Sequence, residues 1–202
     1  MNKKVYLVTP LSKRIPQDID SDYIGIDAGA LRILEVNFPL KMAVGDFDSM
    51  SAEDFNHLQS ICDIERHPIM KDETDAELGI WIAQKLGYDE IILYGALSGR
   101  IDHTYLNIYM ISHLYPEVIL MDDTQCVRVL KEGEYVLKNE YKNISFLPIE
   151  ESVVSLDGFL YPLNQFRLKI TDVHTTSNSM IDDESKVIVH SGKILCLMTN
   201  EK

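Results

Sequence analysis

The spacing of apolar residues changes near residue 125, and this change restricts the folds open to the chain. Before that point, short and almost wholly apolar runs alternate with segments whose apolar residues recur every three to four positions. The short apolar runs are typical of parallel strands that are covered on both faces. The segments with helical spacing are typical of the helices that cover such strands. The expected strands are 5–9, 23–27, 42–47, 64–69, 90–96 and 118–122, and the expected helices are 28–37, 52–60, 74–86 and 102–114. Residues 1–125 therefore predict an α/β domain with a mainly parallel sheet flanked by helices.

After residue 125 the apolar runs stay short, and no helical spacing separates them. Turn-forming pairs such as Glu132-Gly133 and Asp157-Gly158 lie between the runs instead. The expected strands are 126–130, 134–138, 144–147, 153–156, 166–170, 186–190 and 194–198. Short strands joined by turns are typical of an antiparallel sandwich. We therefore expect a second domain over residues 126–202, a C-terminal antiparallel β-sandwich.

Composition narrows the function classes. Of the 202 residues, 46% are apolar and 25% are charged, an ordinary globular balance. Lys and Arg number 19 against 32 Asp and Glu, a net charge of −13. Because nucleic acids are held by basic patches, this charge argues against a nucleic-acid partner. The excess carboxylates either keep the protein soluble or hold divalent cations that bring in an anionic substrate.

The first residues and the cysteines indicate a cytoplasmic protein. The apolar run 5–8 is too short for a signal peptide, and no run approaches the roughly 18 apolar residues of a membrane span. Cys62, Cys126 and Cys196 are far apart and odd in number. This spacing fits neither a disulfide framework nor a zinc site, so we expect reduced thiols and no membrane partner.

The first motif that can carry chemistry is 45–49, Gly-Asp-Phe-Asp-Ser, at the end of an expected strand. In extended chain, residues two apart point to the same side, so Asp46 and Asp48 are expected together. Neighbouring carboxylates suit Mg²⁺, which usually bridges to substrate phosphates. The plainer interpretation is a solvated turn.

The second motif is 71–75, Lys-Asp-Glu-Thr-Asp, between an expected strand and an expected helix. Thr74 and Glu77 fit a capping box, and an acidic first turn is normal for a helix. The functional interpretation adds Asp72 and Asp75 to a metal site and Lys71 as a phosphate partner. Trp81, farther along this helix, is expected in the core.

The third motif, 95–103, also joins a strand to a helix. Its glycines allow close backbone approach, and Arg100 can bind phosphate oxygens bidentately. Asp102 is expected to cap the helix, on which His103 and Asn107 share a face. The plainer interpretation is a glycine-rich loop with a surface Arg–Asp pair.

The three motifs follow three successive expected strands. Since the carboxyl ends of parallel strands share one sheet edge, we expect a carboxylate cluster that holds Mg²⁺, flanked by Lys71 and Arg100. Such a cluster neutralises a polyphosphate during group transfer. The chain has no P-loop, no Gly-x-Gly-x-x-Gly and no nucleophile elbow.

With its motifs in this order, the chain resembles the thiamin pyrophosphokinase family almost end to end. The resemblance rests on Gly45–Ser49, on Lys71, Asp72, Thr74 and Asp75, and on Gly99, Arg100, Asp102 and His103. In the second half it rests on 145–148, 158–163 and Ser177-Asn178. The combination is specific, although each motif alone is weak.

The resemblance implies transfer of a pyrophosphoryl group from ATP to the hydroxyl of thiamin, giving thiamin diphosphate and AMP. It implies Mg²⁺ and a homodimer whose active site lies between the nucleotide domain of one subunit and the β-domain of the other. Residues 1–125 would bind nucleotide and metal, and residues 126–202 would bind thiamin.

By position, the resemblance also implies roles for individual residues. The metal ligands would be Asp46, Asp48, Asp72 and Asp75, with Arg100 and Asp102 completing the catalytic set. Nucleotide contacts would come from Asp27, Ser49, Lys71, Thr74, Arg100, His103 and Asn107. Ser177 and Asn178 would hold the thiamin pyrimidine.

Two other functions share these features. One is a Mg²⁺-dependent nucleotide hydrolase or transferase that acts on another acceptor. The other is a non-catalytic module that binds thiamin or nucleotide.

Overall fold

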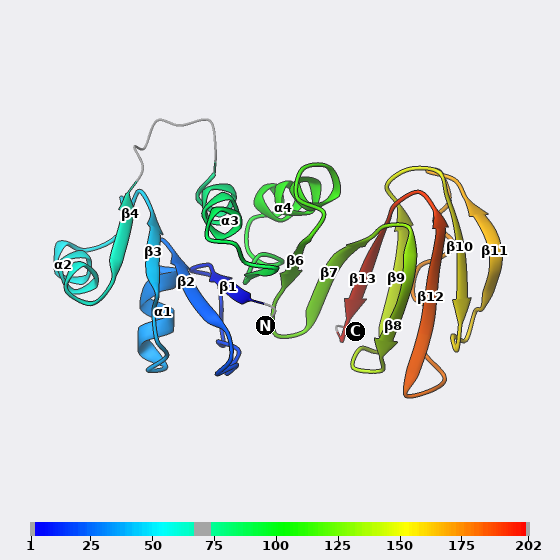
Figure 1. Cartoon of the computed structure of the whole chain (residues 1–202), viewed down its shortest axis with the longest axis horizontal. Coiled ribbons are helices and arrows are strands. Elements are labelled where there is room, and N and C mark those ends of the chain that lie inside the picture. Colours follow the sequence, from blue (N-terminus) through cyan, green and yellow to red (C-terminus); the bar gives the residue numbers. More distant parts are fainter. Residues whose placement is uncertain (1–2, 67–73, 201–202) are drawn as a thin grey trace. The chain divides into compact units, whose positions relative to one another are not determined.

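The computed structural model describes residues 3–66 and 74–200, and Figure 1 labels their helices and strands. The chain forms two compact units. The first comprises Met1–Asn107 and Leu120–Asp123, and the second comprises Ile108–Ile119 and Thr124–Lys202.

The first unit contains a parallel sheet in the order β4-β3-β2-β1-β5. Its strands are β1 (Lys4–Val8), β2 (Asp22–Ile26), β3 (Met42–Gly45), β4 (Asp63–Arg66) and β5 (Glu90–Tyr94). The next strand in the chain is β6 (Val118–Met121). The middle strands are buried almost throughout, which explains their nearly unbroken apolar sequences. The predicted α/β class is confirmed.

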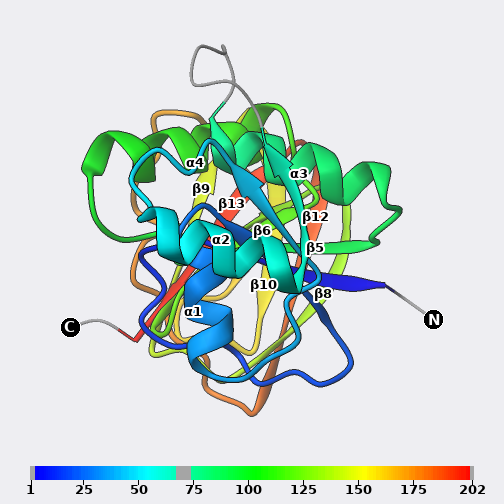
Figure 2. The ribbon, with the colours of Figure 1, turned by 90° about the vertical axis from the view of Figure 1, so that its left-hand side faces the viewer.

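Helices cover both faces of this sheet (Figure 2). The helices that pack on it are α1 (Gly29–Glu35), α2 (Ala52–Ile61) and α3 (Asp75–Lys85). A further helix, α4 (Ile101–His113), follows β5 in the chain. A Cβ on Gly25 would lie 2.2 Å from Ala30 of α1, and a Cβ on Gly79 of α3 would lie 2.4 Å from the Ile26 side chain. Because Gly25 and Ile26 are adjacent in β2, they face opposite sides, and so α1 and α3 pack on opposite faces.

Helix α3 begins where its capping signal predicts, but two other helix expectations are wrong. The Thr74 hydroxyl accepts a hydrogen bond from Glu77 N–H at 3.2 Å. Asp102 does not cap α4, because the helix already begins at Ile101 and Asp102 lies in its first turn. Trp81 is 43% exposed rather than in the core, with Lys85 Nζ 3.3 Å from its ring centroid. Its neighbours in the sequence, Ile80 and Ile82, are buried instead.

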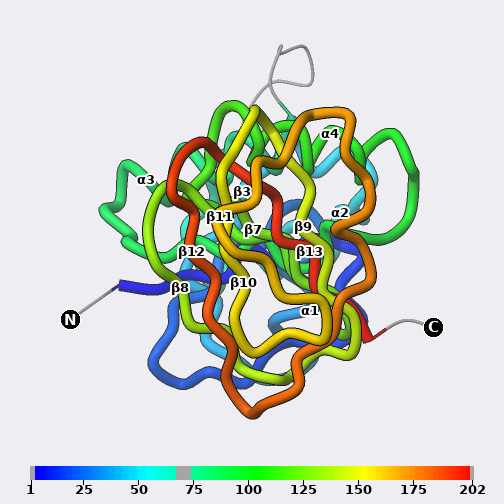
Figure 3. The backbone as a smooth tube through the Cα atoms, turned by 90° about the vertical axis from the view of Figure 1, so that its right-hand side faces the viewer, coloured from blue at the N-terminus to red at the C-terminus, as the bar shows by residue number. Residues whose placement is uncertain are grey.

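The second unit consists mainly of two antiparallel sheets, β7-β13-β9 and β11-β10-β12-β8 (Figure 3). The strands are β7 (Gln125–Leu130), β8 (Gly133–Lys138), β9 (Asn143–Pro148), β10 (Ser152–Asp157), β11 (Leu163–Leu168), β12 (Glu184–Ser191) and β13 (Ile194–Thr199). Buried and less buried residues alternate along β10 and β13, as expected when each strand covers a core with one face. The predicted antiparallel class of this region is confirmed.

Aromatic packing links the strand β9 to the turn after β10. The rings of Phe146 and Phe159 are buried and meet edge to face, with centroids 5.6 Å apart. Edge-to-face contact is the favoured geometry of aromatic pairs. This contact anchors the turn that begins at Gly158, which matters for the site described below.

Two further properties concern the chain as a whole. Cys62, Cys126 and Cys196 are free thiols, and the last two are buried. Within the described ranges, the helices are all too short or too polar to cross a membrane.

Candidate functional site

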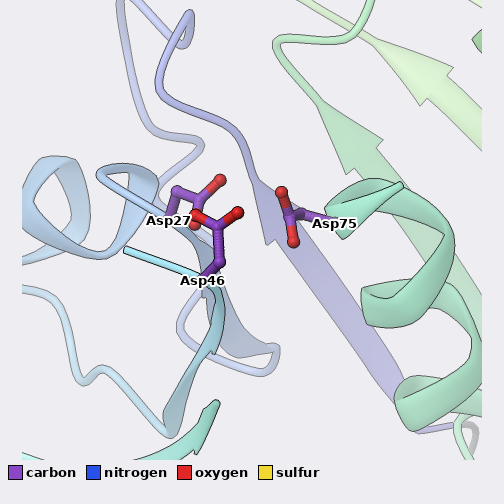
Figure 4. Close-up of side chains that lie close together, drawn as sticks. All are labelled: Asp27, Asp46 and Asp75. Carbon is purple, nitrogen blue, oxygen red and sulfur yellow. The ribbon is translucent and has the colours of Figure 1, made fainter. Parts of the chain in front are cut away.

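Three aspartates meet at the carboxyl edge of the parallel sheet (Figure 4). Asp27 directly follows β2, Asp46 directly follows β3, and Asp75 is the first residue of α3. One carboxylate oxygen from each lies within 4.8 Å of the other two, and all three residues are half-buried. We call these residues the aspartate cluster.

An unusual backbone brings Asp27 and Asp46 together. Asp27 adopts a φ of 47°, with its N–H bonded to Val44 O at 2.9 Å and its Oδ1 accepting from Phe47 N–H at 3.3 Å. A Cβ on Gly45 would lie 1.9 Å from Asp27 Oδ1, so only glycine permits this approach. Left-handed conformations at non-glycine residues are costly and concentrate at functional sites.

The turn after β3 is held in place by an apolar anchor. Phe47 also has a left-handed backbone, with a φ of 58°. Its ring is buried and lies 5.4 Å from that of Phe55 on α2, within a cluster that includes Ala43 and Leu58. Burial of an aromatic ring stabilises the fold by a few kcal/mol (roughly 2–3), enough to offset one strained residue.

The charges of the aspartate cluster are unfavourable without a cation. The pKa of Asp27 is raised to about 7, first by burial and then by the carboxylate of Asp75, with a smaller contribution from Asp46. A divalent cation would remove this repulsion and keep all three groups ionised. Converging carboxylate oxygens are the ligands that Mg²⁺ prefers, so these residues fit the metal predicted from the sequence.

The strand order supports a ligand site at this edge. The chain builds β1 to β4 toward one side of the sheet and then adds β5 on the other side of β1. Ligands in open α/β sheets bind where the order reverses, beyond the carboxyl ends of the strands. The loop after β1 is tied to the end of β5, since Thr9 N–H and Ser12 Oγ both donate to Tyr94 O at 3.0 Å.

The other site residues predicted from the first and second motifs do not belong to the aspartate cluster. Asp48 and Ser49 are exposed, and Asp48 N–H donates to Asp46 Oδ1 at 3.1 Å. The left-handed Phe47 interrupts the extended chain on which the expectation for Asp46 and Asp48 rested, and Asp48 is not among the three aspartates that converge. Thr74 serves as the helix cap. Lys71 and Asp72 lie outside the described residues.

In the third motif, Arg100 is paired with an acid from its own loop. Its Nε and one terminal nitrogen donate to the two Asp102 oxygens at 3.1 and 2.6 Å. This bond lowers the pKa of Asp102 to about 2. Both side chains are exposed, His103 is exposed beside them, and Asn107 Nδ2 donates to Ala96 O at 3.0 Å. Asn107 therefore braces the loop after β5.

The two residues predicted to hold thiamin have different environments. Ser177 is exposed and has a left-handed φ of 56°. Asn178 is only 3% exposed, and its side chain bonds to the main chain of Tyr161 and Ser179. Both residues lie in the second unit, and Asn178 forms part of its interior.

The sequence pointed to Asp27 as a nucleotide contact and not as part of a metal cluster. The signal that would have included it is its position, since it follows a predicted strand directly, as Asp46 does. The same rule that gathers acids after parallel strands applies to both residues.

Comparisons with known proteins agree with these features. The family model described as "Thiamin pyrophosphokinase, catalytic domain" matches residues 19–121, and "Thiamin pyrophosphokinase, vitamin B1 binding domain" matches residues 130–195. A thiamine pyrophosphokinase of Bacillus subtilis is 27% identical over 190 residues, which are 89% of this chain and 87% of that protein.

Solved structures give the same result. A thiamin pyrophosphokinase family protein from Enterococcus faecalis superposes with a TM-score of 0.87 at 25% identity, covering 99% of this chain and 100% of that one. A thiamin pyrophosphokinase from Geobacillus thermodenitrificans gives a TM-score of 0.83 at 26% identity, covering 100% of this chain and 99% of the other.

Proposed function

Because the chain belongs to the thiamin pyrophosphokinase family, and is thus a kinase that converts thiamin to thiamin diphosphate with ATP as donor, we propose that it uses MgATP and releases AMP. The observation that carries this proposal is the aspartate cluster, whose oxygens lie within 4.8 Å of one another. We assign nucleotide and metal binding to residues 1–125 and thiamin binding to residues 126–202.

In this reaction the thiamin hydroxyl oxygen attacks the β-phosphorus of ATP. A bond forms between that oxygen and the β-phosphorus, and the bond from the β-phosphorus to the oxygen shared with the α-phosphorus breaks. AMP leaves with the shared oxygen, and an aspartate at this sheet edge accepts the hydroxyl proton. Positioning and charge neutralisation supply most of the rate enhancement in such transfers.

The aspartate cluster would hold the metal, with Asp48 and Asp72 as further ligands. Asp48 is exposed next to the cluster in sequence, and its main-chain bond to Asp46 keeps the turn closed. Bound Mg²⁺ supplies charge neutralisation at the phosphate oxygens. The fixed backbone of Asp27 and Phe47 keeps the carboxylates converged before any ligand arrives.

Arg100 would bind the phosphates in place of its present partner. Its guanidinium makes a bidentate pair with Asp102, the geometry that also suits a phosphate group. Since the pair is exposed, exchanging one anion for another costs little. Ser49, Lys71, Thr74, His103 and Asn107 belong to the same three loops and complete the proposed nucleotide site.

We propose that the protein works as a homodimer. Ile101, Tyr105 and Tyr109 are spaced four residues apart on α4, and all three are exposed. Four-residue spacing puts side chains on one helix face, and an exposed apolar face commonly marks a protein interface. Sedimentation velocity should give twice the chain mass, and a monomer at assay concentrations would contradict this proposal.

We also propose that the protein acts in the cytoplasm. Its three cysteines are free, and two of them are buried in the second unit. Free buried thiols are typical of proteins in reducing compartments.

The proposed function is tested by product analysis. With ATP, Mg²⁺ and thiamin, we expect AMP and thiamin diphosphate in equal amounts. Formation of ADP, or nucleotide turnover without thiamin, would contradict the proposal. The matched control is Asp63→Asn, which removes an exposed acid on β4 and should leave the rate unchanged.

A further inference from the structure

Asn178 is buried in the second unit, and its carboxamide is almost fully used by the protein. Its Oδ1 accepts from Tyr161 N–H at 3.0 Å and from Ser179 N–H at 2.9 Å, and its Nδ2 donates to Tyr161 O at 2.9 Å. The reversed amide would set its NH₂ against two N–H donors, so the chemistry fixes this orientation. Both lone pairs of Oδ1 are occupied, and the residue is 3% exposed. Asn178 therefore has no acceptor left for a ligand.

The main chain of Asn178 closes a bulge against β9. Asn178 and Ile144 exchange both main-chain hydrogen bonds, at 2.8 and 2.9 Å, and Phe146 N–H donates to Thr175 O at 2.9 Å. Ile144 and Phe146 are two residues apart, whereas Thr175 and Asn178 are three apart. The facing segment thus holds one extra residue, as in a β-bulge, and bulges commonly re-aim side chains near functional sites.

Ser177 occupies this bulge and owes its conformation to it. Its φ of 56° is left-handed, and its N–H donates to Ser145 Oγ at 3.0 Å. Such a backbone persists in a non-glycine residue only where neighbouring bonds enforce it. The bonds of Asn178 on one side and of Ser145 on the other therefore fix the exposed side of Ser177.

The same carboxamide ties the bulge to the turn after β10. Leu160 N–H donates to Ser179 O at 2.8 Å, and the Asn178 side chain binds Tyr161 at both its N–H and its C=O. Leu160 and Tyr161 are exposed, whereas Phe159 before them is anchored against Phe146. The bulge and this turn are thus tied together by hydrogen bonds.

We infer that Asn178 is a positioning residue of the thiamin subsite, which acts by fixing Ser177 and the 160–161 segment and not by contacting thiamin. The inference rests on the proposed assignment of thiamin to the second unit. It separates two neighbouring residues by role: Ser177 is exposed to the acceptor, and Asn178 sets where Ser177 stands. Acceptor affinity then depends on Asn178, whereas the nucleotide site in the first unit does not.

The first test compares Michaelis constants for the two substrates. Asn178→Ala should raise the KM for thiamin about tenfold or more, with the KM for ATP and the kcat at saturating thiamin within about threefold of wild type. The matched control is Ser152→Ala, which removes a buried hydroxyl bonded to Glu150 O and Lys193 O in the same unit. An equal rise in the thiamin KM for both variants would show a general loss of structure and overturn the inference.

The second test is a double-mutant cycle with Ser177. If Asn178 acts through Ser177, Ser177→Ala should raise the thiamin KM in the wild type but change it less than about twofold in the Asn178→Ala background. If the fold-changes in the thiamin KM of the two single variants multiply in the double variant, the two residues make independent contacts and the inference is overturned. No effect of Ser177→Ala alone would also overturn it.

A binding measurement separates this inference from the proposed function. Titration calorimetry with thiamin alone reports the acceptor subsite without any turnover. If the wild type binds thiamin and Asn178→Ala binds it about tenfold more weakly, the dependence of acceptor affinity on Asn178 stands even if AMP is not formed. Unchanged thiamin affinity in Asn178→Ala overturns the positioning role even if AMP is formed.

Discussion

Strand β2 has an aspartate at its start and another just after its end, and their electrostatic surroundings are opposite. At the amino edge of the sheet, Asp22 accepts from Lys41 Nζ at 2.7 Å and from the Tyr88 hydroxyl at 2.5 Å. Burial alone would raise the pKa of Asp22, but these two bonds outweigh it and lower the pKa. At the carboxyl edge, the pKa of Asp27 is raised to about 7 by burial and by Asp75.

The difference shows that the charges at the amino edge of this sheet stabilise the fold, whereas those at its carboxyl edge destabilise it. At the amino edge, Asp22 meets an opposite charge and a hydroxyl, and Lys4 meets Asp18 at 3.1 Å. At the carboxyl edge, three carboxylates face one another. Strongly perturbed carboxyl groups concentrate at functional sites because their arrangement serves a ligand and not the fold.

The largest effect is expected from a substitution in the aspartate cluster at the carboxyl edge of the sheet. Asp46→Ala removes one ligand from the proposed metal site, so kcat/KM should fall about 10³-fold. The midpoint of thermal unfolding should stay the same or rise, since repulsion within the cluster is relieved. Steady-state kinetics and circular dichroism measure the two effects, and Asp63→Asn serves as the exposed control. Activity within tenfold of wild type would remove Asp46 from the site.

Adding Mg²⁺ should relieve the repulsion between carboxylates at the carboxyl edge and so reduce its electrostatic difference from the amino edge. A cation that binds only the folded protein stabilises it by about 2.7 kcal/mol at one hundred times its dissociation constant. Unfolding of the wild type should therefore shift upward by about 5–10 °C in MgCl₂ without nucleotide. The shift should vanish in Asp46→Ala and persist in Asp22→Asn. KCl at equal ionic strength is the control, and equal shifts in both salts would refute a specific site.

Asp27→Asn should raise the stability of the protein and lower its activity. Asparagine tolerates the left-handed backbone and still accepts from Phe47 N–H, but it carries no charge. Without metal, the variant should be more stable by about 1–2 kcal/mol at pH 8, while turnover falls at least tenfold.

The pH dependence of Asp27→Asn follows from the direction of the pKa shift. Because the folded pKa of Asp27, about 7, lies above the unfolded value, ionisation weakens the wild-type fold as pH rises from about 4 to about 7. The advantage of the variant should therefore be smallest near pH 4 and level off above about pH 7. Denaturant titrations across this range measure it, and a difference that stays constant with pH would show that ionisation of Asp27 is not its cause.

Much of this fold follows from patterns that the chain carries locally. Apolar runs and helical spacing predicted the parallel sheet and its helices because side-chain period follows the backbone directly. The rule that parallel strands share a carboxyl edge predicted that Asp46 and Asp75 would be neighbours, and they are.

The details that the sequence did not show depend on backbone turns and on distant pairings. Asp27 joins the aspartate cluster, and Asp48 is exposed beside it in the turn, because Asp27 and Phe47 leave the extended conformation. The structural use of Asn178 depends on bonds to Ile144 and Tyr161, which are far from it in the chain. No periodic pattern records a single bulge or a single left-handed residue.

The smallest expected effect concerns the amino edge. Lys41→Met removes the charge that Asp22 binds, and because both side chains are about 40% exposed, solvent limits the loss to about 0.5–1 kcal/mol at pH 7. The folded pKa of Asp22 is lowered, so the pair contributes above the unfolded pKa of about 3.9 and is lost as pH falls through the folded value. Urea titrations should show the cost shrinking below about pH 4, with turnover unchanged. Lys138→Met, at an exposed site on β8, is the control; an equal or larger cost there would mean that the Asp22 pair adds nothing to the fold.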